Sequence, residues 1–259
     1  MTGNTINLQA LARQLIGLLD LTSLNDMDTE DSIARLCSRA VTAHGPVAAV
    51  CVWPRFVPYC REWLYGSEVR VATVVNFPGG RANQGIAMAE TAAAVAYGAH
   101  EVDLVFPYRA WLAGDRQSCQ ALLAGCREVC GEHVLLKVIL ETGELPDQRT
   151  VTLMGQDTIS AGADFLKTST GKTAEGASLE SSMAMLEAIR HAPRPVGFKA
   201  AGGIRTLGEA VQYMELVDSV LGSGCVTPGL FRIGASSLLD DLLKTLGEDA
   251  PAQPAAGAY

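Results

Sequence analysis

The sequence predicts an α/β fold, a TIM-type (β/α)8 barrel with an extra N-terminal helix. Short, continuous apolar runs rich in β-branched residues recur along the chain, which is typical of parallel strands buried on both faces. Helical patterns separate most of these runs. The chain has 259 residues, which suits eight strand–helix units in a single domain over residues 1–259. A doubly wound open sheet is the structural alternative.

The N-terminal part contains two predicted helices and the first apolar run. Residues 7–19 have the pattern of an amphipathic helix that precedes the main fold. Asp28 and Thr29 are suitable N-caps for a second helix that continues to about Ala43. The first predicted strand then occupies residues 47–53, and a proline stops it.

Seven further runs complete the predicted barrel. They occupy residues 69–76, 101–106, 135–141, 165–170, 196–201, 219–222 and 231–234. The helical patterns cover residues 85–97, 115–130, 148–161, 178–191, 207–216 and 238–246. The link between the last two runs is too short for a full helix. Residues 250–259 are rich in Ala and Pro, and we expect them to form a flexible C-terminal tail.

Composition excludes several classes of function. The formal net charge is −8, which argues against broad nucleic-acid binding because such binding needs a basic face. No apolar run approaches the roughly 18–20 residues of a membrane span, so no membrane partner is expected. The first residues lack the basic and apolar regions of a signal peptide, and we therefore predict a cytoplasmic protein.

Cysteine and histidine spacing points to no metal site. The seven cysteines are scattered and form no CxxC pair, so free thiols in a reducing compartment are expected. The four histidines show no HExxH or other paired spacing. We therefore predict no metal site.

Four charged residues lie in the middle of apolar runs, namely Asp103, Lys137, Lys167 and Lys199. Burial of a lysine is costly because it disfavours the ammonium form. That cost suggests a use for Lys167 as a neutral amine that attacks a carbonyl group. A neighbouring Lys199 would lower the pKa of Lys167, and Asp103 would hold the remaining cation and transfer protons. The alternative is that these residues form a buried structural ion network or are exposed.

Three glycine-rich turns follow the later runs, and we expect them to bind a phosphate group. They cover residues 170–172, 201–206 and 234–237, and polar residues or a helix start follow each one. The predicted phosphate-binding residues are Gly171, Lys172, Gly202, Gly203, Gly234, Ser236 and Ser237. A nucleotide P-loop is rejected because position 166 is Leu where that motif needs Gly.

Several ordered motifs resemble deoxyribose-phosphate aldolase. They are residues 102–107 (VDLVFP), 136–142 (LKVILET), 165–171 (FLKTSTG) and 197–206 (GFKAAGGIRT), with shorter matches at 20–25, 76–78 and 231–237. The resemblance extends from about Asp20 to Leu246 and includes the terminal Tyr259. The chain departs from the family at Ala200, where proline is common, and over residues 222–229.

The resemblance implies a class I aldolase on a TIM barrel. Members of this family reversibly cleave 2-deoxy-D-ribose 5-phosphate to D-glyceraldehyde 3-phosphate and acetaldehyde in deoxyribonucleotide catabolism, without a cofactor. The resemblance implies that Lys167 forms the Schiff base and that Lys199 perturbs the pKa of Lys167 and assists proton transfer. It also implies that Asp103 donates and accepts protons through a water molecule. Family members are often dimers, so the resemblance implies a homodimer.

The resemblance also implies substrate contacts. These fall on Thr22, Asn25, Cys51, Lys137 and Thr170, and the terminal Tyr259 would swing into the site to help move a proton. Two rival interpretations remain open from the sequence. One is another phosphosugar lyase or isomerase on the same barrel, and the other is a non-catalytic barrel that binds a phosphorylated metabolite.

Overall fold

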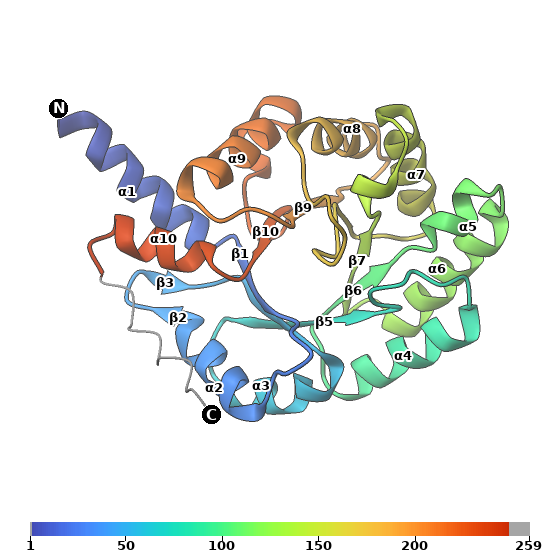
Figure 1. The fold of residues 1–259 in the computed structure, drawn as a ribbon, viewed down its shortest axis with the longest axis horizontal. Coiled ribbons are helices and arrows are strands. Elements are labelled where there is room, and N and C mark those ends of the chain that lie inside the picture. Colours follow the sequence, from blue (N-terminus) through green and yellow to red (C-terminus); the bar gives the residue numbers. More distant parts are fainter. Residues whose placement is uncertain (1, 249–259) are drawn as a thin grey trace.

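The protein is a closed barrel of eight parallel strands surrounded by helices, as the sequence predicts (Figure 1). We describe it from a computed structural model, in which residues 2–248 are placed. Strand β1 pairs with β4 on one side and with β10 on the other, which closes the sheet. This closure excludes the doubly wound open sheet. The predicted tail at residues 250–259, with Tyr259, lies outside the described residues.

The barrel strands follow one another in chain order around the sheet. They are β1 (Leu19–Ser23), β4 (Ala49–Val52), β5 (Arg70–Val75), β6 (Glu101–Val105), β7 (Leu135–Ile139), β8 (Phe165–Lys167), β9 (Gly197–Ala201) and β10 (Phe231–Ala235). A small antiparallel hairpin, β2 (Val41–Thr42) and β3 (Gly45–Pro46), lies outside the barrel.

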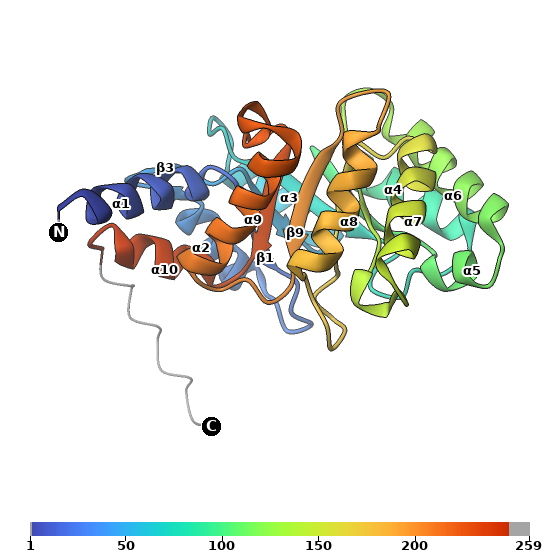
Figure 2. The same cartoon turned by 90° about the horizontal axis from the view of Figure 1, so that it is seen from above.

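Helices form the outer layer. They are α1 (Thr2–Ile16), α2 (Glu30–Arg39), α3 (Val57–Trp63), α4 (Gln84–Ala96), α5 (Tyr108–Leu112), α6 (Arg116–Cys130), α7 (Gln148–Ser160), α8 (Leu179–Arg190), α9 (Leu207–Leu221) and α10 (Leu238–Thr245). Three short 3-10 turns, η1 (Pro54–Phe56), η2 (Thr142–Glu144) and η3 (Ser223–Cys225), complete the described elements. The extra N-terminal helix α1 lies beside α10 and projects from one side of the barrel (Figures 1 and 2).

Local signals explain where most helices begin. Six N-cap side chains accept a hydrogen bond from the backbone three residues further on, and they are Thr29, Asn83, Asp115, Asp147, Ser178 and Thr206. Thr206 and Glu209 also form a capping box. The predicted helix after Thr29 ends at Arg39 and not at Ala43, because the chain turns there into the β2–β3 hairpin.

Two predicted elements are wrong, and the two errors compensate in the strand count. Residues 219–222 are the last turn and C-cap of α9, since the apolar spacing of that helix continues through Leu221. The eighth strand is β1, whose first residue was predicted as the end of the N-terminal helix, which in fact ends at Ile16. Lys137, Lys167 and Lys199 therefore lie on the fifth, sixth and seventh barrel strands, and not on the fourth, fifth and sixth.

The core has two parts. A large apolar layer lies between the strands and the helices, and a smaller cluster of Leu24, Ala49, Cys51, Ala72 and Val74 lies inside the barrel. The register places Asp103 beside Lys137 and Lys167 beside Lys199. Charged side chains therefore share the barrel interior with a few small apolar ones. No helix within residues 2–248 is long and apolar enough to cross a membrane.

Candidate active site

The barrel interior contains a cluster of seven charged side chains. They are Asp20, Glu101, Asp103, Lys137, Lys167, Lys199 and Arg232, and none is more than 3% exposed. They come from β1, β6, β7, β8, β9 and β10. Ionised groups can be buried in this way only when opposite charges and hydrogen bonds replace water. The cluster therefore depends on how its members pair.

Asp103 is the carboxylate that joins the three lysines. Its Oδ1 accepts a hydrogen bond from Lys137 Nζ at 2.9 Å. Its Oδ2 accepts hydrogen bonds from Lys167 Nζ and from Lys199 Nζ, each at 2.8 Å. The predicted proximity of Lys167 and Lys199 is thus present, because both ammonium nitrogens lie against one oxygen atom.

Three further charged residues support this arrangement, and no role was predicted for them from the sequence. Asp20 Oδ2 lies 2.5 Å from Lys199 Nζ, and Glu101 Oε2 lies 2.5 Å from Lys137 Nζ. Arg232 bridges these two carboxylates, with Nη1 at 2.7 Å from Asp20 and Nη2 at 2.9 Å from Glu101. The sequence indicates these residues only weakly, because none lies in the middle of an apolar run. Glu101 is the first residue of its run, Arg232 lies near the start of another, and Asp20 follows directly on the predicted end of the N-terminal helix.

The pairing leaves Lys167 with the fewest partners. Lys137 and Lys199 each contact at least two carboxylates, whereas Lys167 contacts only Asp103 among the described residues. Burial lowers the pKa of Lys167, and the charge on Lys199 lowers it further against the opposing effect of Asp103. Burial also acts to lower the pKa of Lys199, but Asp103 and Asp20 outweigh it and raise that pKa.

Asp103 remains ionised in this environment. Burial acts to raise its pKa, but the three lysines outweigh that effect and hold the pKa well below its usual range. The Cys51 thiol lies in the same interior, and burial raises its pKa, with Asp103 acting in the same direction. Cys51 is therefore a neutral thiol beside the charged cluster.

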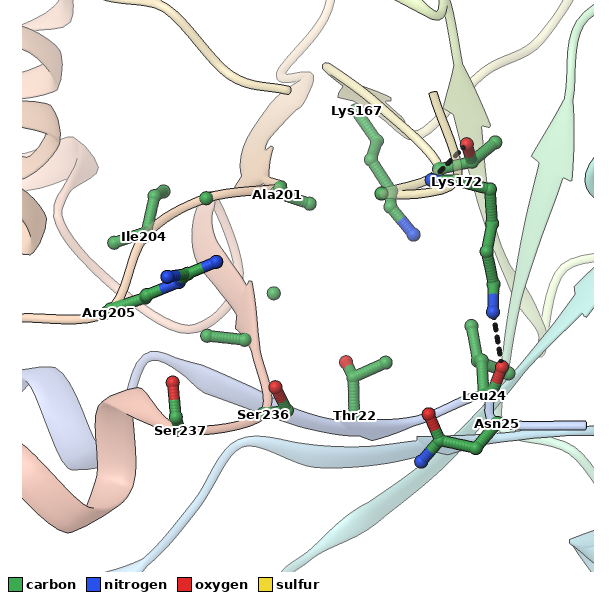
Figure 3. Close-up of a pocket in the computed structure, with 16 residues that line it drawn as sticks. Thr22, Leu24, Asn25, Lys167, Lys172, Ala201, Ile204, Arg205, Ser236 and Ser237 are labelled. Atoms are coloured by element: carbon green, nitrogen blue, oxygen red, sulfur yellow. Dashed lines mark hydrogen bonds between the residues drawn. The ribbon is translucent and has the colours of Figure 1, made fainter. Parts of the chain in front are cut away.

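A pocket of about 270 Å³ opens above the cluster, at the C-terminal ends of the strands. The Lys167 side chain points into it from β8, and Ser236 and Ser237 lie on its other side (Figure 3). The loops after β1, β8, β9 and β10 form its wall. A TIM barrel places its functional groups at this end, and loops seven and eight there often bind phosphate.

The pocket wall is held by hydrogen bonds between loops. Glu141, which is fully buried and has a φ of 54°, accepts hydrogen bonds from Thr170 N at 3.1 Å and Thr170 Oγ1 at 2.6 Å. Lys172 Nζ donates to the Leu24 carbonyl at 2.7 Å and so links the β8 loop to the β1 loop (Figure 3). Gly202 and Gly203 have φ values of 94° and 91°, which a side chain would disfavour.

The structure brings together most of the residues predicted to bind substrate or phosphate. Those that line the pocket are Thr22, Asn25, Lys167, Thr170, Gly171, Lys172, Gly202, Gly203, Gly234, Ser236 and Ser237. Arg205, which was predicted only as part of a turn, also lines it. Asp103, Lys137, Lys199 and Cys51 are fully buried in the barrel interior and are not among the lining residues.

The two departures from the family motifs have structural contexts. Ala200 is fully buried on β9 and contributes no polar group. Within residues 222–229, the Pro228 carbonyl accepts a hydrogen bond from Arg232 Nε, so this segment contacts one member of the charged cluster. Within residues 2–248, no group of three His, Cys, Asp or Glu side chains is placed to hold a metal ion.

Comparison with known proteins gives consistent matches. Residues 14–244 match the sequence model of a family described as DeoC/LacD family aldolase. A protein of Coccidioides immitis, provisionally named a deoxyribose-phosphate aldolase, is 28% identical with a TM-score of 0.81, covering 91% of this chain and 87% of its own. An aldolase called QR15 is 27% identical with a TM-score of 0.77, covering 90% of this chain and 96% of its own.

A more distant structure has the same fold. The deoxyribose phosphate aldolase of Aeropyrum pernix, described as having a unique tetrameric structure, is 24% identical with a TM-score of 0.75. The match covers 95% of this chain and 99% of that one.

Proposed function

The chain belongs to the DeoC/LacD family of aldolases, and we propose that it reversibly cleaves 2-deoxy-D-ribose 5-phosphate to D-glyceraldehyde 3-phosphate and acetaldehyde. One observation carries this proposal. A buried lysine of lowered pKa lies beneath a pocket whose rim is lined by glycine turns, hydroxyl side chains and Lys172. An amine and an anion site at opposite ends of one pocket fit a sugar phosphate that carries a carbonyl at its other end.

The reaction begins at the carbonyl carbon of the open-chain sugar. The neutral amine of Lys167 attacks C1, and loss of water gives a protonated imine. The imine accepts the electron pair of the C2–C3 bond when that bond breaks, and the C3 hydroxyl loses its proton. D-Glyceraldehyde 3-phosphate leaves, and an enamine of two carbons remains on Lys167. Protonation of the enamine at C2 and hydrolysis of the imine release acetaldehyde.

Asp103 and Lys199 would manage the protons. We assign to Asp103, acting through a water molecule, the removal of the C3 hydroxyl proton and the return of a proton to C2. Lys199 donates to the same Asp103 oxygen as Lys167, so it is placed to exchange protons with that carboxylate and to keep Lys167 neutral.

The phosphate group would bind at the rim. The turns at Gly171–Lys172, Gly202–Gly203 and Ser236–Ser237 line the rim, and α10 begins directly after Ser237, so backbone N–H groups of the glycine turns and of the helix start would bind the anion. Thr22, Asn25 and Thr170 would contact the sugar hydroxyls. Cys51 and Lys137 were predicted as substrate contacts, but both are fully buried below the pocket, and we propose that they shape its floor.

Cellular location and assembly are two further proposals. The seven cysteines are free thiols, which suits the predicted cytoplasmic location. A homodimer remains our proposal for assembly, and sedimentation of the purified protein would measure it.

The experiment has two readouts. Release of D-glyceraldehyde 3-phosphate is followed by a coupled assay, and the imine is trapped on the protein with acetaldehyde and cyanoborohydride. We expect turnover, and an ethyl adduct that peptide mapping places on Lys167. Lys167→Ala should abolish both signals, whereas Lys244→Ala, a lysine in the last turn of α10, should leave both unchanged.

The outcomes separate the rival functions. Turnover of another phosphosugar without any trapped adduct would indicate an isomerase or lyase that uses acid–base chemistry alone. Binding of sugar phosphate with neither turnover nor trapping would indicate a non-catalytic barrel. Equal trapping by Lys167→Ala would show that the imine forms elsewhere.

A further inference from the structure

A second pocket lies at the opposite end of the barrel. Its volume is about 310 Å³, and it is lined by Arg61, by the segment 64–71 that leads into β5, and by His100 just before β6. These residues precede their strands, whereas the active-site loops follow theirs. The two pockets are therefore on different faces of the molecule, and the proposed aldolase reaction does not use the second one.

The second pocket has positive charge that is poorly balanced. Arg61 has no carboxylate within ion-pair distance among residues 2–248. Arg70 Nε lies 2.8 Å from Glu101 Oε1, but Glu101 is shared with Lys137 and Arg232 inside the barrel. Glu68 also lines the pocket, yet it forms no ion pair with either arginine. In a protein with a net charge of −8, two arginines facing one cavity are conspicuous.

The hydrogen bonds of His100 fix which of its nitrogens carries the proton. Val71 N donates to His100 Nδ1 at 2.9 Å, and His100 N donates back to the Val71 carbonyl at 2.8 Å. Since Nδ1 accepts a hydrogen bond, the neutral imidazole carries its proton on Nε2. Burial lowers the pKa of His100, and Arg61 and Arg70 lower it further while Glu101 opposes them, so the surroundings favour the neutral ring.

The Arg61 guanidinium lies against the His100 ring, and both side chains line this pocket. The neutral ring therefore adds an N–H donor to a pocket that already holds guanidinium donors. The stem of Arg61 lies over Gly98, where an added Cβ would be 3.5–3.9 Å from Arg61 atoms. An oxyanion bound between Arg61 and His100 can accept hydrogen bonds from both side chains.

We propose that this pocket is a second anion site, which binds a phosphate dianion between Arg61, Arg70 and the Nε2–H of His100. Guanidinium groups offer paired donors that match phosphate oxygens, and a dianion compensates two unbalanced cations better than a monoanion does. The phosphate could be inorganic or a monoester. An apolar wall from Leu64 and Val69 would lie beside the ester group of an organic phosphate.

The test observes the ring signals of the four histidines of the chain by NMR. The full-length protein is labelled with 13C-histidine, and His100 is assigned from the spectrum of His100→Gln. Inorganic phosphate is titrated at pH 7 with sodium chloride keeping the ionic strength constant. We expect a saturable change in the His100 ring signals, with much smaller changes at His44, His133 and His191.

Matched variants identify the site. Arg61→Gln should lower the affinity for phosphate, as read from the His100 signals, at least about tenfold, since one charge-assisted contact to the anion is lost. Arg190→Gln, which removes an exposed arginine that shares Glu187 with His191, should leave that response unchanged. Lys172→Gln alters the active-site rim, and the His100 response should persist in it, which excludes phosphate in the aldolase pocket as the cause.

Three results would overturn the proposal. They are a His100 response that does not saturate, an equal response to acetate at the same ionic strength, and an unchanged affinity in Arg61→Gln. If Arg61→Gln disturbs the other histidines, Arg61→Lys replaces it, because it keeps the charge and removes the paired donors. A stronger response to glycerol 1-phosphate than to inorganic phosphate would support a monoester as ligand, and an equal response would support the free ion.

Discussion

Replacing Lys199 by Met tests the electrostatic basis of the proposed mechanism. The change removes one cation from the barrel interior with little change in side-chain length. Lys167 then loses a neighbouring positive charge and no longer shares Asp103 Oδ2 with a second ammonium group. Both effects raise the pKa of Lys167, so less of the amine is neutral at a given pH.

The distances set the magnitude. Both nitrogens lie 2.8 Å from one oxygen, so they are at most 5.6 Å apart. With an effective dielectric constant of about 20, two unit charges at that distance repel by about 3 kcal/mol. About 1.4 kcal/mol corresponds to a factor of ten. The neutral fraction of Lys167 should therefore be roughly a hundredfold lower in Lys199→Met than in the wild type, at pH values below the Lys167 pKa of either protein.

The assay is the pH dependence of imine trapping with acetaldehyde and cyanoborohydride, measured by mass spectrometry. The trapping rate falls at low pH as Lys167 becomes protonated, and this acid limb should move to higher pH in Lys199→Met. Lys199→Arg retains the charge and should keep the limb closer to its wild-type position. Circular dichroism controls for folding. An acid limb that stays in place, or that moves to lower pH, would refute the role of Lys199.

The other predictions concern the rim and the barrel interior. Lys172→Gln should raise KM for 2-deoxyribose 5-phosphate at least about tenfold while affecting unphosphorylated deoxyribose less, because a cation at the rim is lost; equal effects on both substrates would contradict a phosphate contact. Gly197→Ala places a Cβ 2.3 Å from the Phe165 ring and should destabilise the fold by about 1–3 kcal/mol in denaturant unfolding, whereas Gly208→Ala, with open space around it, should not. Arg232→Met removes a cationic partner from the buried carboxylates of Asp20 and Glu101 and should lower the free energy of unfolding by about 3–5 kcal/mol. The pKa values of Asp20 and Glu101 are lowered in the folded protein, so the stability that their ionised forms contribute is present above their unfolded pKa values near 4 and is lost as the pH falls further. The difference in Tm between Arg232→Met and the wild type should therefore shrink at acid pH. A wider difference at acid pH would contradict the assignment.

The strand pattern was predictable because the barrel buries its strands on both faces. The six runs from β4 to β9 are continuous and apolar, and their positions follow directly from composition. Strand β1 was missed because it is short, follows a helix closely and has Asp20 at its second position. Its strand conformation depends on pairing with β4 and with β10, and no local signal in the sequence reports those distant partners.

The charged cluster was predictable only in part for a related reason. Asp103, Lys137, Lys167 and Lys199 lie within apolar runs, where a charge is conspicuous. Asp20 and Arg232 form an ion pair across 212 positions of sequence, and each was at the margin of a predicted element. The basic pocket at the other end of the barrel was not predicted, because Arg61, Arg70 and His100 have no motif in common and only the closed barrel brings them together.

Charge balance inside the barrel supports Lys167 as the proposed nucleophile. Four buried cationic side chains share three buried carboxylates, and the half-exposed Arg70 also contacts Glu101, so full ionisation of the buried groups would leave one positive charge in excess where it is costly. Lys137 and Lys199 each contact two or more carboxylates, and Arg232 contacts two. Lys167 contacts one carboxylate, that of Asp103, which it shares with the other two lysines. Of these four cationic residues, only Lys167 lines the pocket. Loss of its proton balances the interior at three positive and three negative charges. The same pairing that stabilises the barrel interior therefore leaves a neutral amine where a carbonyl group can approach it.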